Sequence, residues 1–175
     1  IWCQLFSEPG AGSDLASLST RAERDGDEFV VNGQKVWTSS AQFSDWGILL
    51  ARTNWDVPKH QGLTMFLVPL DAPGVEIHPI ISIDGRHSFN RVTFDGVTVP
   101  ADHLLHVPGA GFEIAQARLA PGRLHHVARS VGLANRAVHA QSQGDPLLSG
   151  MGTTLVVALW HDHKLTVAHL GDSRL

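Results

Sequence analysis

The stretch of sequence that indicates the fold is residues 28–53, EFVVNGQKVWTSSAQFSDWGILLART. Two short apolar runs flank Asn32-Gly33, and Asn-Gly between such runs is a strong signal for a tight β-hairpin turn. A further apolar run, WGILLART, follows after a short polar segment. These residues therefore predict several short strands, with a hairpin turn at Asn32-Gly33.

The same alternation of short apolar runs and turn residues extends from residue 1 to about residue 106. LTMFLVPL is followed by a turn signal at Asp71–Gly74, then by VEIHPI, and then by RVTFDGVTVP, which stops at Pro100. No apolar stripe with helical spacing interrupts these runs. About six strands at this spacing predict a mainly β fold, an antiparallel barrel or sandwich. A βαβ nucleotide-binding fold is disfavoured for the same reason.

The periodicity changes beyond residue 109. Residues 112–119 carry apolar side chains at helical spacing, which predicts a short helix. Apolar residues then recur in steps of three, four and seven after Pro121, so a second and longer helix is expected to begin there. SQGDPLLSGMG is typical of a linker, and TTLVVALW and LTVAHLG predict a C-terminal hairpin. The expected divisions are a β-domain over 1–108, a helical segment over 109–140, and the linker with its hairpin over 141–175.

Composition limits the functional classes. The 175 residues include 13 Lys and Arg against 17 Asp and Glu, a net charge of −4, so the chain lacks the basic surface that nucleic-acid binding requires. Cys3 is the only cysteine, which excludes an internal disulfide. No apolar run approaches the roughly 20 residues of a membrane span, and a basic signal-peptide region is absent. A globular, cytoplasmic chain is expected.

Two short stretches suggest ligand chemistry. SEPGAGSD places small residues where backbone can approach a flat or phosphorylated ligand closely. KVWTSS puts an aromatic side chain beside three hydroxyl groups, which suits a planar ring that forms hydrogen bonds. Each stretch alone is more often an ordinary turn or the buried end of a strand, and neither matches the GxGxxG or P-loop pattern.

In this order and spacing, however, the two stretches resemble the central β-domain of the acyl-CoA dehydrogenases. FNRVTFDGVTVPADHLL continues the resemblance, and LAPGRLHHVARSVGLA resembles the start of the family's C-terminal helical domain. The likeness covers residues 1 to about 138, and the segment LAPGRLHHVARSVGLA is especially similar to the branch that includes eukaryotic members fused to a kinase-like domain. It implies α,β-dehydrogenation of acyl-CoA thioesters, with FAD as the cofactor.

The resemblance also implies roles for individual residues. Ser13 and Arg123 match positions near the acyl-CoA substrate. The catalytic carboxylate belongs to the C-terminal helical domain, and no residue here matches it, so we expect an incomplete FAD site and an inactive isolated chain. Glu8 lies beside the flavin-matching turn, but a structural role there is favoured over that of a base. The residues that match FAD-contacting positions are Phe6, Ser7, Gly12, Ser13, Trp37, Thr38 and Ser39.

The C-terminal residues have a different character. GMGTTLVVALWHDHKLTVAHLGDSRL, from Gly150 onward, resembles a fragment of a bacterial metal-dependent phosphatase of the 2C type. Asp172 matches a position near an auxiliary metal, but the main metal ligands have no counterpart, so neither a metal site nor phosphatase activity is expected. The sequence then indicates a chimera joined near residues 139–149. The alternatives to a dehydrogenase fragment are a phosphatase fragment and a non-catalytic β-module, and the helix or the hairpin is expected to support a homo-oligomer.

Overall fold

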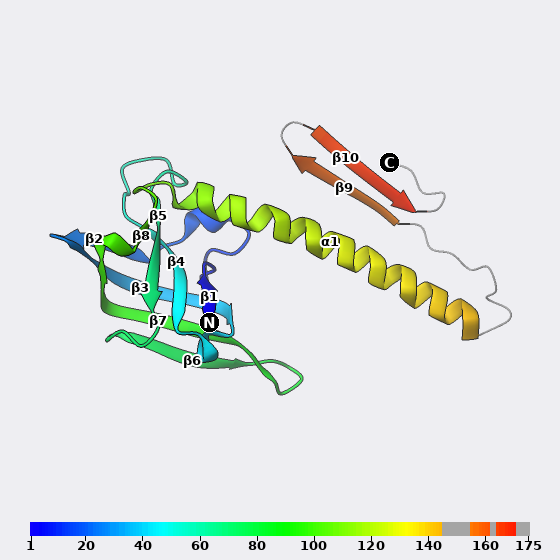
Figure 1. Cartoon of the computed structure of the whole chain (residues 1–175), viewed down its shortest axis with the longest axis horizontal. Helices are drawn as coiled ribbons and strands as arrows, with labels where there is room; N and C mark the ends of the chain where they lie inside the picture. The colour runs from blue at the N-terminus through cyan, green and yellow to red at the C-terminus, as the bar shows by residue number, and fades with distance from the viewer. Residues whose placement is uncertain (145–154, 162–163, 171–175) are drawn as a thin grey trace. The chain divides into compact units, whose positions relative to one another are not determined.

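The computed structural model describes residues 1–144, 155–161 and 164–170. The chain forms two compact units, residues 1–117 and residues 118–175. The first unit, called the β-unit below, contains eight strands, shown from blue to green in Figure 1. They are β1 (Trp2–Leu5), β2 (Arg21–Asp25), β3 (Glu28–Ser39), β4 (Trp46–Arg52), β5 (Leu63–Pro69), β6 (Val75–Ile81), β7 (His87–Pro100) and β8 (Leu104–Leu105).

The eight strands form one sheet in the order β6-β7-β3-β2-β4-β5-β8, and β1 pairs with β4. Most neighbours are antiparallel, while β1 runs parallel to β4 and β2 makes a short parallel contact with β4. The apolar runs identified in the sequence at residues 46–53, 63–70, 75–80 and 91–100 all lie mainly within strands. The prediction of a mainly β fold is thereby confirmed.

The sheet is open, so the closed-barrel form of the prediction is wrong. The strand path ends at β6 on one side and at β8 on the other, and no pairing among the described residues joins these two ends. The physical reason is that β8 has only two residues before the chain leaves the sheet to enter a helix. So short a strand pairs with β5 but offers too few backbone groups to hold a second neighbour.

The open sheet nevertheless curls around one apolar core. Phe29 of β3 and Phe66 of β5 pack edge to face with ring centroids 4.9 Å apart. Because β2 and β4 lie between these strands, a flat sheet would separate them by roughly 14 Å. The core that results contains Leu5, Phe29, Val31, Leu49, Phe66, Val68, Val92, Phe94, Val97 and Val99 among its buried members.

The expected hairpin at Asn32-Gly33 is wrong, because β3 runs unbroken through both residues. Its pairing with β7 changes register at this point, which marks an irregularity of the β-bulge kind rather than a turn. Gly33 has φ of 149°, and a Cβ there would lie 2.5 Å from Oγ1 of Thr20. Asn32 accepts a hydrogen bond from the backbone N–H of Gly96 at 2.9 Å. Asn32 and Gly33 therefore make long-range contacts with Gly96 and Thr20 and do not form the turn that the local sequence indicated.

One continuous helix, α1 (Gly111–Gly144), replaces the two helices expected from the sequence. Pro121 lies inside it, although proline lacks the N–H that would bond to the preceding turn. The lost bond is local, and the residues on both sides of it include many Ala, Leu and Arg, which favour helix. The first turns belong to the β-unit, where Ala115 is fully buried.

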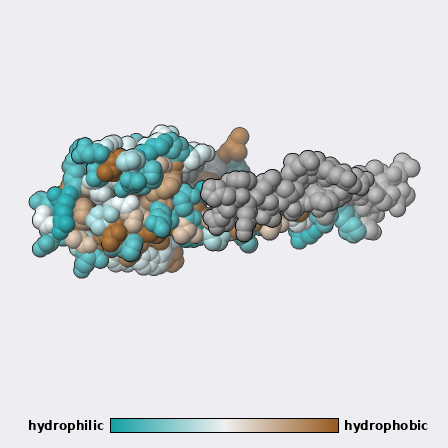
Figure 2. Space-filling model, turned by 90° about the horizontal axis from the view of Figure 1, so that it is seen from above, coloured by the Kyte–Doolittle hydropathy of each residue, from teal (hydrophilic) through white to brown (hydrophobic). Residues whose placement is uncertain are grey.

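The C-terminal strands β9 (Leu155–His161) and β10 (Lys164–Leu170) pair antiparallel with Lys164 opposite His161, which confirms the predicted hairpin. Of the predicted linker, residues 142–144 belong to α1 and the rest lie outside the described residues. No described helix is long and apolar enough to cross a membrane. Figure 2 shows apolar residues scattered in separate spots among polar ones on one face of the β-unit.

Candidate functional site

The two sequence segments singled out for ligand chemistry meet in the fold. The backbone N–H of Val36 donates a hydrogen bond to the carbonyl of Ser7 at 2.9 Å, which joins the segment after β1 to β3. A cavity of about 400 Å³ lies between the two segments. Four residues predicted to contact FAD, about 30 positions apart in sequence, therefore share one cavity. Its lining residues are Trp2, Cys3, Gln4, Phe6, Ser7, Val36, Trp37, Ser39 and Ser40.

Trp37 is held at the rim of this cavity by an irregularity in β3. Lys35 faces Val92 of β7 and Thr38 faces Asn90, so three steps along β3 match two along β7. Trp37 lies in this bulge with φ of 60°, a value that is rare for a bulky side chain and is found where function demands it. Its indole packs edge-on against a phenylalanine of β7 and remains 61% exposed. The strand thus presents a large aromatic surface at the cavity.

Thr38 lies between Trp37 and Ser39 and is buried. Its backbone carbonyl accepts a hydrogen bond from Nδ2 of Asn90 at 3.1 Å. Its hydroxyl Oγ1, by contrast, is buried and has no hydrogen-bond partner within the described part of the chain. A buried hydroxyl without a partner costs about 1–3 kcal/mol. Thr38 does not line the cavity, so the fit to a flat, hydrogen-bonding cofactor such as FAD rests on the exposed indole of Trp37 and on the Ser7 and Ser39 side chains that line it.

Asn90 belongs to a small polar network that bonds to Thr38, which lies between two lining residues of the cavity. It is fully buried, and its Nδ2 also donates to Oε1 of Gln42 at 2.6 Å. Its Oδ1 lies 2.7 Å from Nε2 of His87. Sequence reasoning missed Asn90, because Thr38 and Gln42 are about 50 residues away in the chain. The Asn90 side chain holds the Thr38 backbone carbonyl and makes no hydrogen bond to the Thr38 hydroxyl among the described residues.

The remaining predicted site residues, Thr38 among them, are not lining residues of the cavity. Gly12 and Ser13 occupy an exposed bend in the turn that follows Ser7 and do not line it. A Cβ added at Gly12 would meet no atom within 4 Å, so the fold itself does not require glycine there. Arg123 lies on α1 in the second compact unit. Asp172 falls outside the described residues.

A buried ion pair joins the two segments that line the cavity, and sequence reasoning missed it. Nζ of Lys35 is 2.7 Å from Oε1 of Glu8 and donates to the carbonyl of Phe6 at 3.1 Å. Lys35 is completely buried and Glu8 nearly so. The signal was present in the alternation of β3, because Lys35 has the same parity as the buried Phe29 and Val31.

The environment of Glu8 makes it unsuitable as a catalytic base, in line with the structural role that the sequence favours. Its carboxylate also accepts hydrogen bonds from both backbone N–H groups of Ser19 and Thr20, at 2.6 and 2.9 Å. Burial raises the pKa of Glu8, but the combined opposite effect of Lys35 and these donors is larger. The pKa of Glu8 is therefore lowered to about 2. Burial lowers the pKa of Lys35 to about 8, against the opposing effect of Glu8. Both groups are charged at neutral pH and serve structure.

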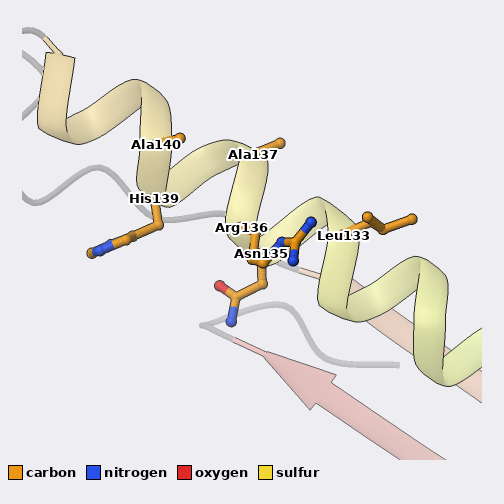
Figure 3. A pocket seen from close by; sticks show the side chains of 6 residues that line it. All are labelled: Leu133, Asn135, Arg136, Ala137, His139 and Ala140. Atoms are coloured by element: carbon orange, nitrogen blue, oxygen red, sulfur yellow. The ribbon is translucent and has the colours of Figure 1, made fainter.

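Two other features carry no site. A depression of about 690 Å³ runs along α1, but Figure 3 shows its lining side chains, including Leu133, Asn135 and His139, pointing to different sides of the helix. Within the described ranges, no group of three or more His, Cys, Asp or Glu side chains is placed to hold a metal ion. Cys3, by contrast, lines the cavity beside Trp37, and burial raises the pKa of its thiol, so the thiol is protonated at neutral pH.

Comparison with known proteins identifies the family of the chain. Residues 3–97 match the family described as acyl-CoA dehydrogenase, middle domain, which classes the β-unit as a domain of a flavoenzyme. The chain belongs to the acyl-CoA dehydrogenase family. Members of this family use FAD. The resemblance stated from the sequence is confirmed at this level.

Curated relatives support the same assignment. Acyl-CoA dehydrogenase IpdE1 of Mycobacterium tuberculosis is 55% identical over 119 residues, which cover 68% of this chain and 31% of that protein. Acyl-CoA dehydrogenase family member 11 of Homo sapiens is 41% identical over 145 residues, covering 78% of this chain and 19% of that protein. The chain therefore spans about a third or less of the length of these relatives.

Solved structures agree with the sequence matches. The Tcur3481-Tcur3483 steroid ACAD is 36% identical with a TM-score of 0.72, covering 85% of this chain and 39% of that one. A probable acyl-CoA dehydrogenase from Mycobacterium abscessus is 30% identical with a TM-score of 0.74, covering 82% and 38%. The resemblance of residues 150–175 to a phosphatase, and with it the chimera, gains no support from these matches.

Proposed function

We propose that this chain supplies the flavin-contacting middle domain of an acyl-CoA dehydrogenase that oxidises acyl-CoA thioesters between their α and β carbons. The observation that carries the proposal is the cavity shared by the two family-matching segments, and Thr38, which lies between two of its lining residues, keeps a buried hydroxyl with no partner within the described residues. Its sequence neighbours Trp37 and Ser39 both line the cavity, and they lie inside the segment that matches the family. FAD is the proposed cofactor, and the acyl-CoA thioester is the proposed substrate.

Each part of the chain has a proposed role. When bound, FAD would supply the acceptor for the hydride that leaves the substrate. Phe6, Ser7, Trp37, Thr38 and Ser39 bind and orient the flavin ring, while Gly12 and Ser13 offer open backbone to its phosphates. Ser13 and Arg123 contact the acyl-CoA.

The domain divisions are part of the proposal. Residues 1–108 form the middle β-domain, residues 109–140 open the C-terminal helical domain of the family, and residues 141–175 follow as linker and hairpin. The carboxylate that removes the α-proton is assigned to that helical domain, to a position that no residue of this chain matches. We also infer that the enzyme works as a multi-chain assembly, because a similar solved structure is the ChsE4-ChsE5 complex of Mycobacterium tuberculosis. A cytoplasmic location stays a prediction.

The test is a titration of the 175-residue chain with FAD, followed by flavin absorbance and tryptophan fluorescence. The parent chain is compared with Thr38→Val, which keeps the shape of the side chain and removes the hydroxyl. In the absence of FAD, the variant should be as stable as the parent or more stable by about 1 kcal/mol, because an unsatisfied group is gone. Its FAD dissociation constant should rise about tenfold, equivalent to about 1.4 kcal/mol.

The outcomes separate the candidate functions. Absence of any flavin signal with the folded parent chain would contradict the proposal and favour a non-catalytic β-module. Equal FAD affinity in both chains would show that the cofactor does not use the Thr38 hydroxyl. A phosphatase is not proposed, since only the short C-terminal resemblance favours it.

A further inference from the structure

We infer that Glu8 and Lys35 act as a positioning pair that sets the separation between the two walls of the FAD cavity. One wall is the Phe6-Ser7 segment, and the other is the bulged part of β3 that carries Trp37 and Ser39. The inference rests on the proposed function, because it assigns the pair a role in FAD binding beyond folding.

The ion pair lies where the two walls are joined. The Lys35 ammonium donates to the backbone carbonyl of Phe6 at 3.1 Å and pairs with Glu8 at 2.7 Å, so one side chain of β3 holds two nearby points of the opposite wall. The next residue, Val36, donates its N–H to Ser7. Three successive connections therefore fix residues 6–8 against residues 35–36, immediately before the bulge.

The first wall depends on these connections. After β1 ends at Leu5, the chain forms no strand until Arg21. Glu8 closes this excursion by exchanging backbone hydrogen bonds with Ala11 and by accepting the N–H groups of Ser19 and Thr20 with its carboxylate. Without Lys35, residues 6–8 would still be joined to β3 by the backbone hydrogen bond between Val36 and Ser7, but no longer by the two connections beside it.

Stability alone does not account for a buried ion pair. Desolvation of two charges offsets much of their attraction, and apolar residues of similar volume are often as stable or more stable. What an apolar pair cannot do is donate a hydrogen bond to the Phe6 carbonyl or bond to the N–H groups of the loop. The geometry at the cavity wall is therefore the property that the pair specifies.

The test uses the double substitution Glu8→Gln with Lys35→Met in the 175-residue chain. The double variant removes both charges of the pair together, and the introduced glutamine keeps one acceptor oxygen for the loop while its NH2 group faces the other backbone N–H. We expect a cooperative urea transition at a lower urea concentration than that of the parent chain. We also expect an FAD dissociation constant about tenfold higher, because the Phe6 carbonyl has lost its donor.

Hydrogen exchange gives a readout that needs no FAD. The Val36 amide, bonded to Ser7, should exchange at least about tenfold faster in the double variant because the wall it bonds to is no longer held. The Asp95 amide, which donates to Gly74 at 3.0 Å away from the pair, is the matched control and should be unchanged. Glu8→Asp keeps both charges and shortens the reach by one methylene, so it should also accelerate Val36 exchange.

The results distinguish this inference from the proposed function. A parent chain that binds no FAD would contradict the proposed function, and Val36 exchange would still decide whether the pair positions the wall. A folded double variant with parental FAD affinity and parental Val36 exchange would overturn the inference. If the double variant does not fold, Glu8→Asp decides: parental Val36 exchange in that variant overturns the inference, and accelerated exchange supports it.

Discussion

Asn90 holds the backbone of Thr38 through a 3.1 Å hydrogen bond from Nδ2 to the carbonyl oxygen, while the Thr38 hydroxyl keeps no partner among the described residues. The same threonine is thus fixed by its main chain, while its buried hydroxyl leaves its hydrogen-bonding capacity unused. The neighbouring Trp37 and Ser39, which line the cavity, are held in place by the same backbone.

Asn90→Ala should loosen this arrangement. The substitution leaves the Thr38 carbonyl and the Gln42 side chain without their shared donor, so we expect a loss of about 2 kcal/mol in the free energy of unfolding. FAD affinity should fall with it. Asn32→Ala is the control, because it removes a single hydrogen bond that is exposed and lies away from the cavity. We expect its free energy of unfolding to fall by about 1 kcal/mol or less and its FAD affinity to equal that of the parent chain. Urea unfolding and FAD titration of both variants measure the difference, and equal FAD affinities would count against a role for Asn90.

Glu8 predicts a specific dependence of stability on pH. Its pKa is about 2 in the folded chain against an ordinary value of 4.5, so its ionised form stabilises the fold above pH 4.5. This contribution, on the order of 3 kcal/mol, should be lost as the pH falls from 4.5 through 2. Glu8→Gln should be less stable than the parent at pH 7, and the difference should shrink toward pH 2. The assignment would be contradicted if the difference in urea midpoint between the two chains stayed constant across this pH range.

Gly33→Ala should destabilise the β-unit. The new Cβ would lie 2.5 Å from the Thr20 hydroxyl and 2.7 Å from the Thr20 Cα, in a backbone conformation that side chains rarely adopt. We expect a loss of about 2 kcal/mol or more. Gly10→Ala is the matched control, since a Cβ there meets nothing within 4 Å, and its effect should stay within about 0.5 kcal/mol. Thermal unfolding of both variants tests the contrast, and similar losses would show that contact with Thr20 is not the cause.

Gly12→Ala separates folding from cofactor binding. Because no protein atom lies within 4 Å of the added Cβ, the variant should unfold like the parent chain. If the FAD phosphates approach this backbone closely, the same methyl group should raise the FAD dissociation constant about tenfold. FAD titration by fluorescence quenching checks this. Parental affinity would exclude close approach at Gly12, while leaving the cavity beside Trp37 in place.

Much of the β-unit could be predicted from local sequence. Runs such as WGILLART and LTMFLVPL formed the expected strands because alternation and turn residues agree with the final pairing. The Asn32-Gly33 hairpin failed because β7 pairs along both halves of β3 and Gly96 uses the Asn32 side chain. Closure of the sheet depends on how two distant ends meet, which no local pattern encodes.

The candidate site divides in the same way. Trp37 and Ser7 were recognised because both lie in short segments that resemble a known family, and the fold places them on one cavity. Lys35 and Asn90 were missed because their roles arise from partners 27 and 48 to 52 residues away. Helix α1 shows a related limit, since Pro121 signals a boundary that the surrounding helix-forming residues override.

The open sheet has a consequence for how separate chains behave. An unpaired strand edge is a template on which another polypeptide can add a strand, and β6 is the last strand on its side of the described sheet. Pro79 has no backbone N–H, so β6 has one hydrogen-bond donor fewer for pairing with an added strand. Glu76 and His78 lie 3.1 Å apart on the same strand and are exposed, so polar groups border that edge. The unclosed sheet thereby carries its own protection against edge-to-edge aggregation.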